Sequence, residues 1–212
     1  MTQGRFITIE GGEGGGKSTQ LQRLATRLEP RVGAPLQTRE PGGSPGAEAL
    51  RGLLVTGASD RWSPLAETLI LFAARDDHLN RRIRPALAAG QWVLCDRFSD
   101  STRAYQGAAG GTDPTLIAAL ETRVIGPTRP DLTLLLDLPV EVGLGRASAR
   151  GGDEARFEGK GLAFHQQLRD GFLAIAAAEP ERVAVIDADQ PPDAVEADIW
   201  AVVCDRLLGA GT

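Results

Sequence analysis

The sequence of 212 residues contains only two cysteines, Cys95 and Cys204. Two thiols so far apart are poor evidence for a disulfide, and a reducing compartment is the simpler interpretation. Long hydrophobic runs are also missing, because the longest, Phe172–Ala178, is far shorter than the roughly 18 residues that span a bilayer. Near the N-terminus, Thr8 and Glu10 interrupt the apolar residues, which breaks the pattern of a secretory signal peptide. We therefore expect a cytoplasmic protein with no membrane partner.

Positive charge is not in excess either, because 23 Lys and Arg residues stand against 28 Asp and Glu residues, a net charge of −5. General nucleic-acid-binding proteins need a dominant basic field to displace counterions, so we expect no nucleic-acid partner. A small anionic ligand is compatible with this charge, since local arginines can outweigh the global balance. The length fits one domain, residues 1–212, because domains commonly contain roughly 100–200 residues.

Apolar strand-like runs alternate with helical patterns, which predicts βαβ units and a doubly wound α/β fold with a parallel five-stranded sheet. The expected strands are Phe6–Glu10, Leu36–Arg39, Trp92–Asp96, Leu132–Asp137 and Val183–Asp187. The expected helices are Lys17–Leu28, Pro45–Val55, Pro64–Ala89, Pro114–Ile125, Pro139–Ala149, Gly161–Ala178 and Pro192–Leu207. Ser63-Pro64 and Asp113-Pro114 indicate helix starts, because the missing N–H of proline is not needed there. Residues 150–160 are rich in glycine and charge, which predicts a short mobile lid.

The strongest local signal is GGEGGGKS, which matches the phosphate-binding pattern G-x-x-x-x-G-K-[ST]. Its glycines allow backbone conformations closed to other residues, so that main-chain N–H groups converge on phosphate oxygens. Lys17 is expected to reach the β- and γ-phosphates of a nucleoside triphosphate, and the Ser18 hydroxyl to bind Mg²⁺. The residues expected to bind the triphosphate are Gly11, Gly12, Glu13, Gly14, Gly15, Gly16, Lys17, Ser18 and Thr19.

The surroundings of this motif support phosphate binding. It follows the apolar run FITIE and opens a helical pattern with Leu21 and Leu24 on one face, the strand–loop–helix context that the motif requires. The dinucleotide fingerprint G-x-G-x-x-G fits in no register, because Glu13, Lys17 and Thr19 occupy positions that need glycine. The motif therefore predicts a triphosphate rather than NAD as the nucleotide.

Four further segments resemble the signatures of the bacterial thymidylate kinase family, in that family's order and spacing. They are Thr38–Gly43 (TREPGG), Leu71–Arg75 (LFAAR), Asp96–Phe98 (DRF) and Ser101–Gly107 (STRAYQG). The likeness runs from the phosphate loop into the predicted lid, so it covers most of the chain. It implies a nucleoside monophosphate kinase that transfers the γ-phosphoryl group of ATP to dTMP, with Mg²⁺ as cofactor. It also implies a homodimer, for which the expected helix at 64–89 is a candidate interface, with an ordinary surface helix as the alternative that fits the pattern equally well.

On the acceptor side, the resemblance implies that Arg97 grips the phosphate of dTMP and that Arg39 is a further contact to it. Two anions must be brought together, so a cation between them is electrostatically required. A solvated surface arginine is the alternative for Arg97, and it is the weaker one beside the strand-end Asp96. By the same resemblance, Glu13 binds a hydroxyl of the acceptor sugar.

The implied base contacts lie on two segments. Phe72 would stack on thymine and Arg75 would hydrogen-bond a base carbonyl, while Tyr105 would crowd the ribose 2′ position and Ser101 and Gln106 would contact the base. From the residues alone, Phe72 is more simply a core residue, because apolar helix positions usually pack inward. Arg75 argues for the site, since a charged side chain is not expected on the same core-facing surface.

The donor side has one departure from part of the family. Some members carry a catalytic arginine in the phosphate loop, and Gly14 occupies that position here. Arg150 and Arg156 in the predicted lid are the natural replacements, because lid closure expels water and supplies charge to the transferring group. The resemblance also places Asp96 at the metal, with helix capping as its alternative role. Arg146 would pack on the donor adenine, or else be an ordinary exposed helical arginine.

Two other functions fit the phosphate loop. A kinase for another nucleotide would share the fold and the phosphate chemistry, and only Phe72, Arg75, Tyr105 and Gln106 speak against it. An ATPase or GTPase switch would need to position a hydrolytic water and to present a partner surface. The arginines of the lid and of the acceptor side favour a kinase over such a switch.

Overall fold

A computed structural model describes residues 4–58, 61–150 and 160–209. Its five strands form one parallel sheet in the order β2-β3-β1-β4-β5, which confirms the predicted fold class. The strands are β1 (Phe6–Glu10), β2 (Leu36–Arg39), β3 (Val93–Asp96), β4 (Leu132–Asp137) and β5 (Val183–Asp187). Only Trp92 of the predicted strand residues lies outside them.

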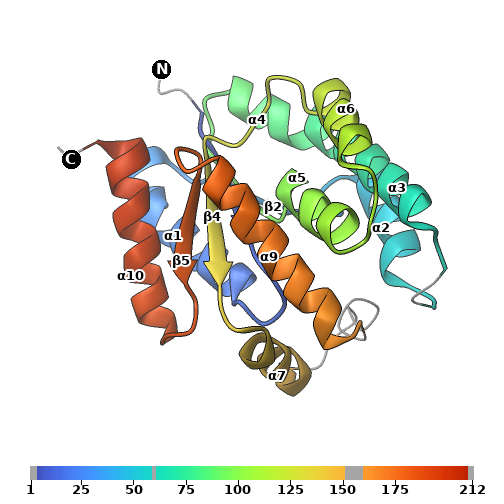
Figure 1. Cartoon of the computed structure of the whole chain (residues 1–212). Helices are drawn as coiled ribbons and strands as arrows, with labels where there is room; N and C mark the ends of the chain where they lie inside the picture. Colours follow the sequence, from blue (N-terminus) through green and yellow to red (C-terminus); the bar gives the residue numbers. More distant parts are fainter. Residues whose placement is uncertain (1–3, 59–60, 151–159, 210–212) are drawn as a thin grey trace.

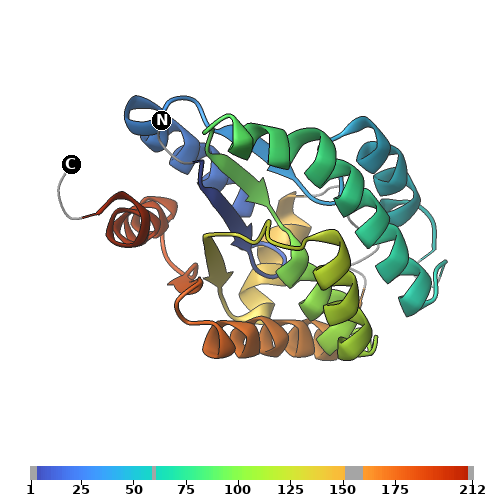
Figure 2. The same ribbon diagram turned by 90° about the horizontal axis from the view of Figure 1, so that it is seen from above.

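Helices cover both faces of this sheet (Figure 1, Figure 2). The α-helices are α1 (Lys17–Val32), α2 (Pro45–Val55), α3 (Pro64–His78), α4 (Arg84–Ala88), α5 (Ser99–Thr102), α6 (Pro114–Val124), α7 (Val140–Arg150), α9 (Leu162–Ala178) and α10 (Pro192–Val203). Three short π-helical segments are η1 (Leu79–Ile83), η2 (Arg103–Ala108) and η3 (Cys204–Leu208). In the ranges 4–58, 61–150 and 160–209, no helix has the length and apolar character needed to cross a membrane.

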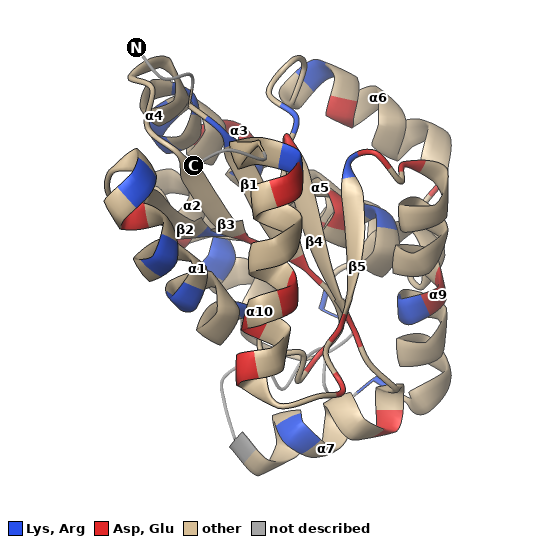
Figure 3. Ribbon diagram, turned by 90° about the vertical axis from the view of Figure 1, so that its left-hand side faces the viewer, with Lys and Arg blue, Asp and Glu red and all other residues tan. Residues whose placement is uncertain are grey.

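The core consists of one apolar layer on each side of the sheet. Alternation along β4 shows this, because Leu134 and Leu136 pack with α1 and α10, whereas Leu135 packs with Phe172 of α9 on the opposite face. All five residues of β1 are buried, as expected for a central strand of a parallel sheet. On the first face, α1 carries several basic residues and the neighbouring α10 several acidic ones (Figure 3).

The predicted helix Pro64–Ala89 is wrong as one continuous α-helix. The structure divides it into α3, the π-helical turn η1 and α4. Pro85 accounts for the break, because proline lacks the N–H that would donate to the carbonyl four residues earlier. The predicted starts are confirmed, since Ser63 Oγ accepts a hydrogen bond from Ala66 N and the Asp113 carboxylate accepts one from Thr115 N.

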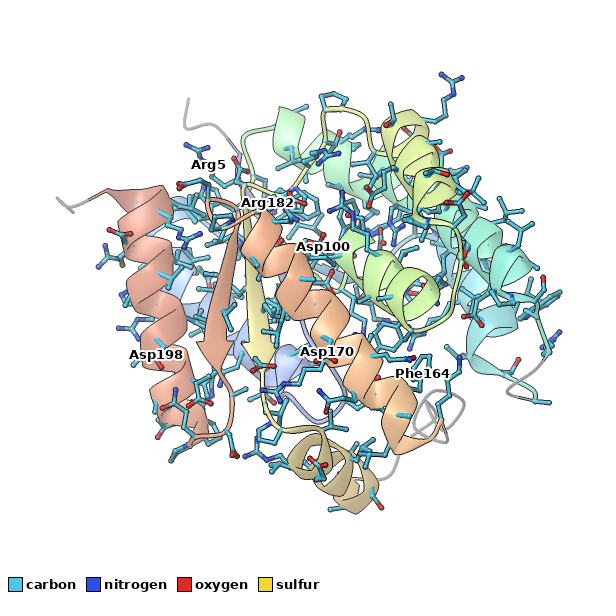
Figure 4. The ribbon with its side chains drawn as sticks, in the orientation of Figure 1. Arg5, Asp100, Phe164, Asp170, Arg182 and Asp198 are labelled. Atoms are coloured by element: carbon cyan, nitrogen blue, oxygen red, sulfur yellow. The ribbon has the colours of Figure 1, made fainter. Side chains whose placement is uncertain are left out.

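The segment from Ser99 to Ala108, which forms α5 and η2, was not predicted to be helical. Its sequence, SDSTRAYQGA, is polar and has no apolar period. Ion pairs hold this segment in place, and Asp100 and Arg182 point toward each other in Figure 4. Arg182 donates to both carboxylate oxygens of Asp100, at 2.7 and 3.0 Å. Asp100 is thereby attached to the turn that precedes β5.

Candidate active site

The predicted phosphate loop connects β1 to α1 and packs tightly against α7. Gly14 has a φ of +69°, and a Cβ atom added there would collide with the carbonyl oxygen of Gly143. A Cβ at Gly143 would in turn approach the carbonyl oxygen of Glu13 to 2.5 Å. Only glycine fits these two positions without movement of the backbone. A longer side chain at position 14, such as arginine, therefore has no room here.

Two polar side chains at the end of the loop are held by hydrogen bonds. Lys17 Nζ donates to the Gly12 carbonyl at 2.6 Å, and Ser18 Oγ donates to Asp96 Oδ2 at 2.6 Å. The alternative role of Asp96 as a helix cap is not seen, because the N-cap residue of α5 is Phe98 and the Asp96 carboxylate accepts from Ser18 Oγ of α1. Asp96 instead faces the start of α1, where a hydroxyl and a carboxylate oxygen meet.

A polar cleft lies in front of the loop, and we call it the central cleft. It is lined by Glu13, Gly14, Gly15, Gly16, Lys17, Ser18, Arg39, Glu40, Arg51, Asp96 and Arg97. Four of these residues are cations, which gives an anionic ligand a site despite the net negative charge of the chain. Arg51 was not among the predicted residues, because one arginine on an amphipathic helix carries no local signal. Arg39 is half exposed and pairs with Glu48 at 3.1 Å.

Arg97 adopts a backbone conformation that is rare outside glycine, with a φ of +67°. Such a conformation costs on the order of 1–3 kcal/mol and persists only where its surroundings enforce it. Its amide donates to the Ile9 carbonyl at 3.0 Å. Its guanidinium donates to the Gly11 carbonyl at 2.9 Å and to Glu13 Oε1 at 3.2 Å. These contacts direct the Arg97 side chain toward the phosphate loop.

Glu13 joins the phosphate loop to η2. Its Oε1 atom also accepts a hydrogen bond of 2.6 Å from the Tyr105 hydroxyl. Burial raises the pKa of Glu13, but Arg97, Lys17 and the Tyr105 hydroxyl lower it more, to about 2. Burial keeps the pKa of Tyr105 well above its ordinary value, so the phenol stays protonated. Glu13 is therefore an anion that accepts from the residues around it at neutral pH.

Glu10, the last residue of β1, belongs to the same arrangement and was not predicted. Its Oε1 accepts from Phe98 N at 2.7 Å and from Ser101 N at 3.2 Å, and its Oε2 accepts from Ser101 Oγ at 2.6 Å. Burial and the nearby Asp100 raise the pKa of Glu10 to about 7. A charged residue at the end of a mostly apolar strand was the available signal, because a buried carboxylate requires hydrogen-bond donors.

An apolar pocket, which we call the inner pocket, opens beside the central cleft. It is lined by Glu13, Glu40, Pro41, Arg51, Leu54, Val55, Leu71, Arg75, Arg97, Phe98, Ser101, Thr102, Tyr105 and Gln106. The predicted Arg75, Ser101, Tyr105 and Gln106 all lie on this wall. Gln106 Nε2 donates to Glu67 Oε1 at 2.9 Å, which fixes the orientation of its amide. The inner pocket and the central cleft share Glu13, Glu40, Arg51 and Arg97.

For Phe72 the structure agrees with the interpretation from the residues alone, whereas the burial of Arg75 differs from what the sequence led us to expect. Phe72 is 2% exposed and is not part of the inner pocket wall, so it is a core residue in this structure. Arg75 is also only 2% exposed, and its guanidinium lies 4.9 Å from the centre of the Phe72 ring. The expectation that a charged side chain would avoid this core-facing surface was wrong, because Glu40 pairs with Arg75 at 2.7 Å.

A third depression, the outer groove, lies behind the phosphate loop. It is lined by Gly14, Gly15, Gly16, Thr19, Gln20, Arg146, Ala188, Asp189, Gln190, Pro191, Pro192 and Val195. Arg146 donates to the Ala188 carbonyl at 2.8 Å and pairs with Asp189 at 3.2 Å. Arg150 is the last residue of α7, and Arg156 lies outside the described residues, as does most of the predicted lid.

A phosphate loop whose polar cleft adjoins a second, largely apolar pocket defines a P-loop phosphotransferase, in which two ligands meet end to end. The family follows from comparison with known proteins. The family model for thymidylate kinase matches residues 9–199. The chain therefore belongs to the thymidylate kinase family.

Individual proteins similar to the chain are also thymidylate kinases. The chain is 65% identical to the thymidylate kinase of Caulobacter vibrioides over 98% of its own length and 99% of that protein. It is 56% identical to the thymidylate kinase of Bradyrhizobium diazoefficiens over 97% and 91% of the two chains. A crystal structure of thymidylate kinase from Ehrlichia chaffeensis matches with a TM-score of 0.78 and 33% identity, covering 94% of this chain and 98% of that one. The resemblance seen in the sequence is confirmed, and with it an ATP-dependent dTMP kinase activity.

Proposed function

We propose that the protein phosphorylates dTMP at the junction of the central cleft and the inner pocket, with the donor held by the phosphate loop. The observation that carries this assignment is the sharing of Glu13 and Arg97 by the two sites. A ligand in each site would direct its phosphates toward the same cations. An oxygen of the dTMP phosphate forms the new bond to the γ-phosphorus, and the bond to the β–γ bridging oxygen breaks to release ADP.

Little covalent chemistry is asked of the protein in this reaction. The acceptor phosphate is already an ionised nucleophile at neutral pH, so no general base is required. The side chains align the two phosphates, reduce their repulsion and exclude water, which would otherwise hydrolyse ATP. Lys17 faces the β- and γ-phosphates in this assignment, and the outer groove beside Arg146 and Thr19 takes the adenosine end of the donor.

Mg²⁺ fits the oxygen pair formed by Ser18 and Asp96. These atoms already lie 2.6 Å apart, and a hydroxyl with a carboxylate is the hard-oxygen set that Mg²⁺ takes alongside phosphates and water. No group of three or more His, Cys, Asp or Glu residues suited to a metal occurs in the described part of the chain, so the donor phosphates must complete the set. The ion supplies neutralisation of charge on the β- and γ-phosphates.

The acceptor phosphate is assigned to Arg97, together with Arg39 and Arg51, which also line the central cleft. Arg97 is held in place by the contacts described above, so it needs no rearrangement. Arg39 pairs with Glu48 at 3.1 Å in this structure and would exchange that partner for phosphate. Arg51 adds a role that the sequence had not indicated.

The nucleoside of dTMP is assigned to the inner pocket. Glu13 accepts from a sugar hydroxyl, the Tyr105 ring fills the space beside the ribose 2′ position, and the base faces Arg75, Ser101 and Gln106. Phe72 supports this wall from beneath Arg75, at 4.9 Å from its guanidinium, rather than stacking on the base. This last point changes the role that the family resemblance implied for Phe72.

Residues 150–160 are proposed to form the lid of a single domain, with Arg150, Arg156 or both completing the charge on the donor phosphates. The crowding at Gly14 supports this, because the phosphate loop has no space for an arginine of its own. We also propose a cytoplasmic homodimer. Leu65 and Leu69 of α3 are 48% and 46% exposed and lie one helical turn apart, which offers an apolar contact along that helix.

A panel of acceptors tests the proposed function. ADP release is measured with ATP alone and with ATP plus dTMP, dUMP, dCMP, dAMP or dGMP. Strong stimulation by dTMP with little release from ATP alone is the expected result. Equal stimulation by a purine nucleotide would contradict the assignment of the inner pocket, and rapid release without any acceptor would favour a switch.

A further inference from the structure

The three nitrogens of the Arg75 guanidinium differ in their hydrogen-bond partners. Its Nε donates to Glu40 Oε2 at 2.7 Å, and its Nη2 donates to the Phe98 carbonyl at 3.2 Å and to Thr102 Oγ1 at 3.0 Å. Its Nη1 is buried and has no hydrogen-bond partner within the described parts of the chain. Arg75 is part of the inner pocket wall, so the nitrogen that lacks a partner belongs to a buried side chain that borders this pocket.

A second layer of buried polar groups lies behind this arginine. His78 Nδ1 is 3.1 Å from Glu40 Oε1, and His78 Nε2 is 2.7 Å from Thr38 Oγ1. Glu40 is 6% exposed and His78 is fully buried. A Cβ atom at Gly43 would collide with the His78 ring, so the TREPGG loop lies directly against the histidine. The contacts therefore connect Thr38 in β2 to His78 in α3, and His78 through Glu40 to Arg75.

The donors and acceptors of this layer assign its protons. A carboxylate that is paired with Arg75 can only accept, so His78 Nδ1 must carry the hydrogen that faces Glu40. His78 Nε2 faces the Thr38 hydroxyl, which can either donate or accept. Both oxygens of Glu40 are thereby occupied, one by Arg75 and the other by His78.

We infer that Glu40 and His78 are positioning residues for acceptor selection, because they orient Arg75 so that its Nη1 donors alone face the base. This inference rests on the proposed role of Arg75 toward the base. A base with a carbonyl at the position that faces Nη1 accepts its hydrogen bond. A base with an amino group there places a second donor against Nη1, and neither N–H group finds an acceptor. A buried polar group left without a partner is what allows large discrimination between such ligands.

The contacts also indicate how the arrangement would fail. Without His78, Glu40 Oε1 lacks its donor and can recruit a second N–H of Arg75. The guanidinium would then turn toward the protein, and the donor that faces the inner pocket would be lost. Without charge on Glu40, the Arg75 cation loses the anionic partner that lies 2.7 Å away, and its orientation is no longer fixed.

Substitution with a measurement of acceptor preference tests the inference. His78→Leu and Glu40→Gln are expected to raise the KM for dTMP about 10-fold or more and to reduce the dTMP-to-dCMP ratio of kcat/KM by a similar factor, with the KM for ATP unchanged. His78→Asn should restore most of the ratio, because its amide N–H can replace Nδ1–H. dUMP shares the carbonyl of dTMP, so the ratio of dTMP to dUMP should stay constant.

Controls separate the possible failures. Glu121→Gln removes a carboxylate of similar burial that pairs with Arg103 at 2.7 Å, and it should leave the dTMP-to-dCMP ratio unchanged. If Arg75→Gln also leaves the ratio unchanged, the proposed role of Arg75 is wrong. If Arg75→Gln lowers the ratio but folded Glu40 and His78 variants do not, the positioning inference alone is overturned. Thr38→Val, which removes only a hydroxyl, gives a milder variant should His78→Leu not fold, and it should lower the ratio in the same direction.

Discussion

Replacing Glu10 by Gln should change how the stability of the protein depends on pH. The pKa of Glu10 is raised from 4.5 to about 7, chiefly by burial and then by Asp100. The folded state therefore holds a proton that the unfolded state has released between these two values. The stability that this group contributes is fully present below pH 4.5 and is lost as pH rises through about 7.

The magnitude follows from linkage. A pKa difference of about 2.5 units corresponds to about 3 kcal/mol at 1.36 kcal/mol per unit, of which about 2 kcal/mol is lost between pH 5.5 and 8. Gln imitates the protonated acid, because its amide oxygen can accept from Phe98 N and Ser101 N where Oε1 does now. Its NH₂ group can donate to Ser101 Oγ in place of the present reversed bond.

The assay is urea unfolding of the wild type and of Glu10→Gln at several pH values from 5.5 to 8.5. Relative to the variant, the wild type should lose about 2 kcal/mol of unfolding free energy between pH 5.5 and 8. Neighbouring Asp100 is present in both proteins, so the difference isolates the pKa of Glu10. A difference between the two proteins that is independent of pH would refute a raised pKa and the burial on which it depends.

The remaining predictions concern the phosphate loop, the lid and α3. Gly14→Ala should reduce kcat/KM for ATP at least about 10-fold. The left-handed conformation alone costs on the order of 1–3 kcal/mol for alanine, and the added methyl group collides with α7. Steady-state kinetics that match the wild type would contradict this. Arg150→Ala or Arg156→Ala should lower kcat about 100-fold or more with little change in the KM for dTMP, and a kcat within a few-fold for both variants would exclude a lid arginine. Leu65→Glu with Leu69→Glu should convert a dimer into a monomer in sedimentation experiments, and an unchanged mass would exclude that face.

The strands and the phosphate loop could be predicted because their signals are local. FITIE and LTLLLD are largely apolar runs of strand length. The spacing of the glycines, lysine and serine in GGEGGGKS predicts a phosphate-binding loop. The break at η1 was less visible, since Pro85 was read as part of a long amphipathic pattern. The helical segment at Ser99–Ala108 was missed because its polar sequence shows no apolar period, and because ion pairs with distant residues, such as Asp100 with Arg182, help to stabilise it.

Individual site residues could be predicted only where they lie in a recognised sequence motif. Arg97, Ser101, Tyr105 and Gln106 were found in this way, and the structure brings them to one pocket wall. Glu40 lies inside the recognised TREPGG segment, but its pairing with Arg75 depends on a contact 35 positions along the chain. A single sequence does not report such contacts. The burial of Arg75 was misjudged for the same reason, because its partner could not be seen.

The account depends most on the claim that donor and acceptor meet in one cleft bridged by Glu13 and Arg97. Calorimetric titration with a bisubstrate analogue, in which adenosine and thymidine are joined by five phosphates, tests this claim directly. The analogue should bind at least about 100-fold more tightly than ATP or dTMP alone, because linked ligands gain from effective concentration. Arg97→Met should remove most of that gain. An analogue that binds no more tightly than dTMP would show that the two sites do not meet there.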